Sequence, residues 1–182
     1  MERAMHKDVE KVLYTEEQLR ERVVAIGQKI TADYQGASPV CIGVLKGSFV
    51  FMADLMRSID LPCQIEFLAV SSYGNKSETT GAVQLMQDLQ ADIEGRDVIV
   101  IEDILDSGLT LSYLINYLSV RNPKSIEICT LLDKPERRRA QVAAKYIGFT
   151  IPDAFIVGYG LDFAERYRNL PYVGILKPEV YA

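Results

Sequence analysis

The stretch Val98-Ile99-Val100-Ile101-Glu102-Asp103-Ile104-Leu105-Asp106-Ser107-Gly108-Leu109-Thr110 decides the fold of this chain. It begins with four consecutive β-branched residues, a pattern typical of a strand buried on both faces of a parallel sheet. Three carboxylates follow within five positions, and then a Ser-Gly-x-Thr loop and a helix with apolar periodicity over 109–118. This order predicts a strand, an acidic turn, a small-residue loop and a helix. In an open α/β sheet such residues lie beyond the carboxyl end of a strand, where ligands bind.

The loop Ser107-Gly108-Leu109-Thr110 has the composition of an anion-binding nest. Gly108 permits a close backbone approach, the two hydroxyls donate hydrogen bonds, and the first free N–H groups of the helix point at the anion. Glu102, Asp103 and Asp106 would repel a bare phosphate, so the ligand must also offer hydroxyl groups or share a divalent cation. An isolated acidic pair before Ser-Gly is usually only a turn and a helix cap. Three carboxylates, a nest and a buried strand together predict a site for a phosphorylated ribose.

Length and composition favour one globular domain over residues 1–182, with 48% hydrophobic and 25% charged residues. The net charge of −5 argues against a nucleic-acid partner, which requires a basic face. Apolar runs fall short of a membrane span and the segment 1–10 is too charged for a signal peptide, so we expect no membrane partner. Cys41, Cys63 and Cys129 are odd in number, lack metal-ligand spacing and lie in apolar runs, which indicates reduced thiols in a cytoplasmic protein.

Hydrophobic periodicity predicts an α/β fold, a mainly parallel twisted sheet flanked by helices. Thr15-Glu16-Glu17-Gln18 is a capping-box pattern that opens the first helix. The expected helices cover 15–36, 49–59 and 109–120, and the expected strands cover 39–45, 64–70, 83–89, 98–101, 125–132, 146–150 and 173–176. We expect residues 1–13 to form a loose arm in which His6 has no role, and residues 177–182 to form a tail.

Further polar segments follow expected strands. The turn Lys46-Gly47-Ser48 can bind phosphate through its backbone N–H groups and the ammonium, although strand-Gly-helix turns are common. Lys134 follows the strand 125–132 and so lies in the same crevice as the acidic loop. The charge run Arg137-Arg138-Arg139 is more typical of a solvated face or a subunit contact than of catalysis. Residues 71–81 are polar and bounded by glycine, which fits either a disordered hairpin loop or a lid.

Nucleotide-binding motifs of other classes do not fit the sequence. It contains no G-x-x-x-x-G-K-[ST], which argues against a P-loop hydrolase, and Gly158-x-Gly160 lacks the third glycine and helix start of a dinucleotide fingerprint. Phe155 lies in a strand-like run and would by default be a core aromatic.

Taken together, these segments resemble the type I phosphoribosyltransferases that act on purines, from about Tyr14 to Leu176. The resemblance implies the same α/β sheet with a small C-terminal hood. It also implies transfer of the 5-phosphoribosyl group from phosphoribosyl pyrophosphate to N9 of hypoxanthine or guanine, giving IMP or GMP and pyrophosphate. Mg²⁺ would be the cofactor, and the assembly would be a homodimer or homotetramer. Because the transition state is oxocarbenium-like, catalysis should be electrostatic and positional.

The resemblance assigns roles to individual residues. Those that would contact phosphoribosyl pyrophosphate are Lys46, Gly47, Glu102, Asp103, Asp106, Ser107, Gly108, Leu109, Thr110 and Arg168. Those that would contact the purine are Ile104, Lys134, Phe155, Ile156 and Asp162, and the metal would be held at Glu102, Asp103 and Asp162. Asp106 would be catalytic, because it would accept the N7 proton as the purine becomes the nucleophile.

Some of these roles carry a specific expectation. Lys134 would contact the exocyclic oxygen at position 6 and select oxopurines over aminopurines, while Phe155 and Ile104 would pack on opposite faces of the ring. Ser72 and Tyr73 would belong to a lid that closes over the reacting centre and excludes water. In this family the peptide bond that corresponds to Leu45–Lys46 can be cis.

One residue of this sequence differs from the corresponding residue of some family members. Leu109 stands where vertebrate members carry lysine, but a nest binds through backbone N–H groups, so phosphate binding should survive.

One alternative is a phosphoribosyltransferase that prefers xanthine or another base. The other is a non-catalytic RNA-binding regulator on the same fold, which the acidic balance and the intact set Asp106, Lys134 and Asp162 disfavour.

Overall fold

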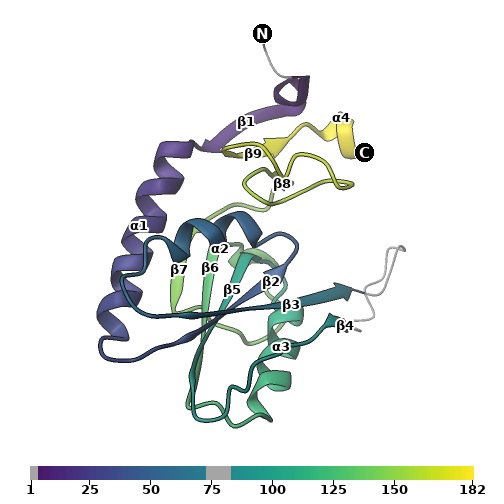
Figure 1. Ribbon diagram of the computed structural model, residues 1–182. Helices are drawn as coiled ribbons and strands as arrows, with labels where there is room; N and C mark the ends of the chain where they lie inside the picture. The colour runs from purple at the N-terminus through teal and green to yellow at the C-terminus, as the bar shows by residue number, and fades with distance from the viewer. Residues whose placement is uncertain (1–3, 73–82) are drawn as a thin grey trace.

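The computed structural model describes residues 4–72 and 83–182. Its centre is a six-stranded sheet in the order β4-β3-β2-β5-β6-β7 (Figure 1). The strands are β2 (Val40–Leu45), β3 (Gln64–Ser72), β4 (Val83–Gln87), β5 (Asp97–Leu105), β6 (Ser125–Asp133) and β7 (Tyr146–Thr150). Neighbouring strands are parallel except β3 and β4, which pair antiparallel. The expected mainly parallel α/β sheet is confirmed.

Helices cover both faces of this sheet (Figure 1). The first, α1 (Glu16–Asp33), begins at the expected capping box, in which the N–H of Thr15 donates to Gln18 Oε1 and the N–H of Gln18 donates to Thr15 Oγ1. With α2 (Phe49–Met56) it packs on one face, and α3 (Leu109–Ser119) packs on the other. Alternation along β5 serves both layers: Ile99 and Ile101 join the α1–α2 core, and Val98 and Val100 join the α3 core.

The strand β5 is longer than the sequence predicts and includes two of the three carboxylates, Glu102 and Asp103. We expected a turn directly after Ile101, but β5 continues to Leu105. The reason is its neighbour β6, which pairs with β5 in parallel from Asp97↔Ser125 to Leu105↔Asp133. The backbone ladder therefore holds Glu102 and Asp103 inside the sheet's carboxyl edge rather than in a turn beyond it.

A small hood lies above this edge (Figure 1). It is an antiparallel sheet in the order β1-β9-β8, made of β1 (Val9–Tyr14), β9 (Val173–Leu176) and β8 (Ile156–Val157). The 3-10 helix η1 (Ala4–Asp8) and the short helix α4 (Pro178–Tyr181) complete it. The expectations of a loose arm over 1–13 and a tail over 177–182 were wrong for the described residues, because each segment has its structural partner at the far end of the chain.

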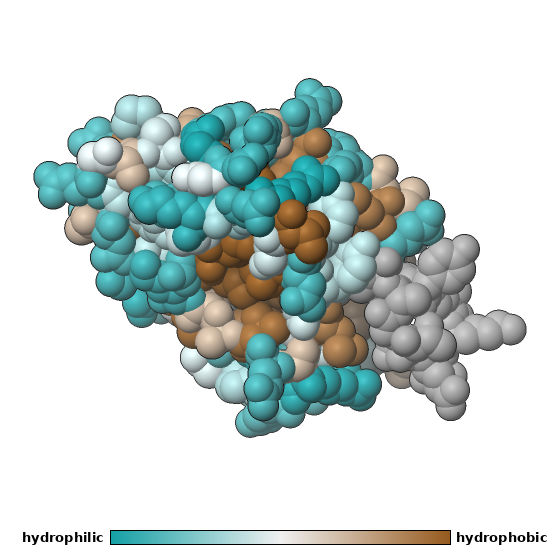
Figure 2. All heavy atoms as spheres, turned by 90° about the horizontal axis from the view of Figure 1, so that it is seen from below, coloured by the Kyte–Doolittle hydropathy of each residue, from teal (hydrophilic) through white to brown (hydrophobic). Residues whose placement is uncertain are grey.

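The face seen from below has an apolar centre bordered by hydrophilic residues (Figure 2). Among the helices of residues 4–72 and 83–182, none is long and apolar enough to cross a membrane.

Candidate active site

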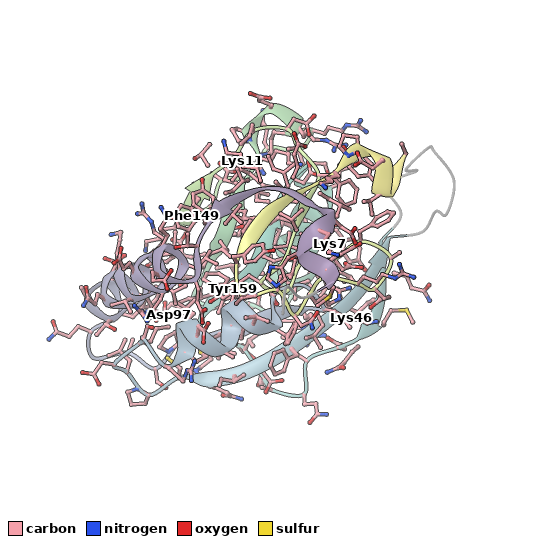
Figure 3. The ribbon with its side chains drawn as sticks, turned by 90° about the horizontal axis from the view of Figure 1, so that it is seen from above. Lys7, Lys11, Lys46, Asp97, Phe149 and Tyr159 are labelled. Carbon is pink, nitrogen blue, oxygen red and sulfur yellow. The ribbon has the colours of Figure 1, made fainter. Side chains whose placement is uncertain are left out.

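Three segments meet at the carboxyl edge with almost no space between their backbones. A Cβ atom placed on Gly47, after β2, would lie 1.7 Å from Oδ2 of Asp103. A Cβ atom placed on Gly160, in the hood segment, would lie 2.1 Å from the carbonyl oxygen of Gly47. Seen from above, the labelled Lys46 and Tyr159 mark this meeting beside α2 (Figure 3). The peptide bond Leu45–Lys46 is cis.

Glu102 and Asp103 form an acid pair at the end of β5. Asp103 is buried and its Oδ1 accepts the N–H of Ile104 at 2.7 Å, while Oε2 of Glu102 is buried without a hydrogen-bond partner in the described chain. Burial, and then the charge of Asp103, raise the pKa of Glu102 well above its usual range. Burial also raises the pKa of Asp103, against its hydrogen bonds and the charge of Arg168. Such a pair fits sugar hydroxyls or a hard cation.

The loop between β5 and α3 has the geometry of an anion nest. Gly108 has φ 79°, in the left-handed region, and the N–H of Leu109 donates to Ser107 Oγ at 3.4 Å. Because α3 begins at Leu109, the N–H groups of its first turn, Thr110 among them, border this loop. On the same loop, Oδ1 of Asp106 is buried and lacks a hydrogen-bond partner among the described residues.

Two cationic side chains lie near this edge: Lys46 directly after β2, and Arg168 in the hood segment. Each is paired with a carboxylate. Nζ of Lys46 lies 3.2 Å from Glu165 Oε1, and this contact is the largest cause that lowers the pKa of Glu165. Arg168 donates from Nη1 to the carbonyl oxygen of Gly160 at 2.9 Å and pairs through Nη2 with Asp162 Oδ1 at 2.9 Å. The other oxygen of Asp162 accepts the N–H of Glu165 at 2.9 Å.

Lys134 follows β6 and is almost fully buried, with 4% of its surface exposed. Its Nζ donates to the carbonyl oxygen of Ala154 at 2.9 Å and lies 3.4 Å from Asp153 Oδ1. Its backbone N–H donates to the carbonyl oxygen of Leu105, the last residue of β5. The ammonium of Lys134 is therefore buried and fixed beyond the end of β6, and its backbone is tied to the end of β5.

Phe155 lies directly before β8 rather than within a strand, and it is 37% exposed rather than part of the core. The ring of Tyr181, in α4, stacks on it with centroids 4.7 Å apart and planes 23° apart. Phe163 meets it edge-on at 5.4 Å. Three aromatic rings thus form one cluster at the hood. The tyrosine was not expected from the sequence, where 177–182 carried no signal beyond a polar end.

The arginine run is the second feature that sequence reasoning missed. The interpretation as a solvated face is wrong for Arg138, whose side chain is 20% exposed, pairs with Asp133 and packs against Gly108. Arg137 is half exposed, yet its Nε lies 3.4 Å from Asp106 Oδ1. The position of this run directly after a strand's carboxyl end was the available signal.

The remaining predicted residues are distributed as follows. Ile104 is partly buried against the α1–α2 core, and Ile156 is buried in β8. The lid was expected over 71–81; Ser72 ends β3, whereas Tyr73 and the rest of that segment lie outside the described residues. Within the described ranges no three histidine, cysteine or acidic side chains form a group that could hold a metal ion by themselves. Asp162 as a metal ligand therefore stays a prediction.

An acid pair, an anion nest and a buried lysine at the carboxyl edge of a parallel sheet define an α/β protein built to hold a phosphorylated sugar and a second ligand. Comparison with known families agrees. A model described as phosphoribosyl transferase domain matches residues 12–164. The chain belongs to this family.

Individual members of the family are similar to this chain over most of its length. The chain is 54% identical to the hypoxanthine-guanine phosphoribosyltransferase of Bacillus subtilis over 97% of this chain and 98% of that protein. It is 52% identical to the bifunctional protein TilS/HprT of Listeria innocua, but spans 28% of that protein's length. A crystal structure of a hypoxanthine phosphoribosyltransferase from Staphylococcus aureus matches with a TM-score of 0.96 at 52% identity, covering 100% of this chain and 99% of that one.

Proposed function

We propose that this protein is a purine-salvage phosphoribosyltransferase, which transfers the 5-phosphoribosyl group from phosphoribosyl pyrophosphate to N9 of hypoxanthine or guanine. The observation that carries the proposal is the meeting of the acid pair Glu102–Asp103, the nest over 107–110 and the buried Lys134 at one sheet edge. The names of the relatives from Bacillus subtilis and Staphylococcus aureus support the same activity.

The phosphorylated sugar would lie across the end of β5. The backbone N–H groups of the nest hold the 5′-phosphate, with Leu109 contributing its amide rather than a charged side chain. Glu102 and Asp103 accept hydrogen bonds from the ribose hydroxyls. Lys46 and Arg168 exchange their carboxylate partners for the pyrophosphate as it leaves, since both are held by ion pairs with exposed or partly exposed acids.

The purine would lie under the hood. Phe155 stacks on one face of the ring and Ile104 packs on the other, while Ile156 and Asp162 contact its edge. Lys134 donates to the oxygen at position 6, for which its buried, fixed ammonium is suited. Asp106 accepts the N7 proton; its Oδ1 makes no hydrogen bond in the described chain and lies 3.4 Å from Arg137 Nε. Ser72 and Tyr73, as part of a lid, would exclude water from the cationic transition state.

Mg²⁺ is the cofactor that fits this site. The unpartnered Oε2 of Glu102, next to the buried carboxylate of Asp103, supplies oxygen donors of the kind that a hard divalent cation prefers. The described side chains form no complete metal cage, so the ion would enter with phosphoribosyl pyrophosphate and share its oxygens. When bound, it would neutralise charge on the leaving pyrophosphate. We also propose a cytoplasmic location and a homodimeric or homotetrameric assembly, which sedimentation velocity would measure.

The direct test is an assay with Mg²⁺, phosphoribosyl pyrophosphate and, separately, hypoxanthine, guanine, xanthine and adenine. We expect nucleotide and pyrophosphate from hypoxanthine or guanine and none from adenine. A clear preference for xanthine would replace the substrate assignment. Failure of every base, with phosphoribosyl pyrophosphate still bound, would overturn the enzyme proposal in favour of a regulator on the same fold.

A further inference from the structure

Four charged side chains form a continuous chain beyond the carboxyl ends of β5, β6 and β7. Asp106 Oδ1 lies 3.4 Å from Arg137 Nε, and Arg137 Nη1 lies 3.7 Å from Asp153 Oδ1. The same Asp153 oxygen lies 3.4 Å from Nζ of Lys134. The signs alternate along the chain, so every neighbouring pair attracts. Its two ends are the residues proposed to read N7 and O6 of the base.

The backbone fixes Arg137 at the middle of this chain. It ends the one-turn 3-10 helix η2 (Pro135–Arg137), and its N–H donates to the carbonyl oxygen of Lys134 at 3.3 Å. Lys134 is itself tied to Leu105 of β5 through its N–H, and the N–H of Arg139 donates to the carbonyl oxygen of Ser107 at 2.8 Å. Both ends of η2 are thus attached to the strand and loop that carry Asp106.

The ion pair between Arg137 and Asp106 contributes little to the stability of the folded protein. Both side chains are more than a third exposed, at 51% and 37%, and ion pairs of that exposure contribute about 0–1 kcal/mol. Oδ1 of Asp106 is nevertheless buried, lacks a hydrogen bond within the described residues, and lies near the Arg137 guanidinium. A positional role explains this arrangement better than a structural one.

We propose that Arg137 is a positioning residue, which holds Asp106 and, through Asp153, Lys134 at a fixed separation. The inference rests on the proposed function, because it assigns the two ends of the chain to N7 and O6 of an oxopurine. A base with a proton at N7 and an oxygen at position 6 would then be bound by Asp106 and Lys134 held at a fixed distance from each other. Arg137 itself need not touch the base or the phosphoribosyl group.

The test compares Arg137→Gln with Arg139→Gln. Both remove one arginine charge two positions apart, but Arg139 enters the described contacts through its backbone N–H. We expect Arg137→Gln to lower kcat/KM for hypoxanthine about tenfold or more, the effect of a lost transition-state contact. KM for phosphoribosyl pyrophosphate and the thermal midpoint should stay at the wild-type values, and Arg137→Lys should recover part of the loss. Equal kinetics for the two glutamine variants would overturn the proposal.

A second measurement separates positioning from other effects. If Arg137 acts through Asp106, Arg137→Gln added to Asp106→Asn should change kcat little beyond the single Asp106→Asn variant. Fully additive losses would show that Arg137 acts independently of Asp106 and would reject the proposal. Wild-type protein that is inactive with every base would instead reject the proposed function. Active wild-type protein with an unaffected Arg137→Gln variant would reject this inference alone.

Discussion

Gly47 is the residue on which the geometry of the edge depends most directly. Its missing side chain lets the turn after β2 lie against Asp103, because a Cβ atom there would come within 1.7 Å of Oδ2. Gly47→Ala must therefore push the turn and the acid pair apart. We expect KM for phosphoribosyl pyrophosphate to rise about tenfold or more, since a displaced contact of this kind reduces transition-state and ground-state binding together.

The matched control is Gly36→Ala. Gly36 has φ 79°, and a Cβ atom placed on it would have no other atom within 4 Å, so the change strains the backbone without touching the site. It should lower the free energy of unfolding by about 1 kcal/mol and leave KM unaltered. If Gly47→Ala loses stability in the same way but keeps its KM, the turn does not position the acid pair.

Glu102 is a residue where function opposes stability. Burial and the neighbouring Asp103 raise its pKa, so the ionised side chain destabilises the folded protein above the ordinary pKa of 4.5. Glu102→Gln removes that charge at nearly constant shape. We expect the free variant to gain about 1 kcal/mol, or roughly 2–4 °C in Tm, at about pH 8 while activity falls. This gain in Tm should shrink as pH falls below the raised pKa toward 4.5, because wild-type Glu102 is then protonated in the folded protein and loses its unfavourable charge. A Tm gain that grows on acidification would refute this account.

Among the helices and strands, α1 is an element whose start could be predicted from a local sequence pattern alone. Thr15 and Gln18 exchange two hydrogen bonds, at 2.9 and 3.3 Å, as the capping-box pattern predicts. Thr15→Ala should lower the free energy of unfolding by about 1 kcal/mol in denaturant titration, because the N–H of Gln18 loses its acceptor. Thr15→Ser keeps an acceptor and should stay near wild type. Equal losses in the serine and alanine variants would mean that the threonine methyl group, not the cap, is what stabilises.

Elements that depend on distant partners were less predictable. The strands β2, β5 and β6 were readable because each carries its own run of apolar residues. In contrast, β1 has no periodicity of its own and becomes a strand because Val9 and Tyr14 pair with Leu176 and Val173, more than 150 residues away. The extension of β5 to Leu105 likewise depends on the ladder to β6. The candidate site follows the same rule: the sequence motifs mark residues at strand ends, whereas no sequence motif marked Arg137 in η2 or Tyr181 in α4.

At the scale of the whole molecule, the hood joins both ends of the chain to the site. The N–H of Lys177 donates to the carbonyl oxygen of Asp8, and Tyr167 Oη donates to Asp8 Oδ2 at 2.7 Å. The hood is therefore built from both the N-terminal and the C-terminal segments (Figure 1). In the proposed arrangement the base lies under the hood and the phosphoribosyl group lies at the central sheet, so substitutions at either end of the chain should change KM for the base more than KM for phosphoribosyl pyrophosphate.

Tyr181 tests this division. Its ring stacks on Phe155, which is 37% exposed and is the residue proposed to stack on the base. Tyr181→Ala removes the backing ring, and an aromatic pair is worth about 0.5–1.5 kcal/mol, so KM for hypoxanthine should rise roughly two- to tenfold. KM for phosphoribosyl pyrophosphate should not change, and Tyr181→Phe, which keeps the ring, should behave as wild type. A parallel rise in both KM values would mean that the hood supports the whole edge, and that the base and sugar sites are not separately built.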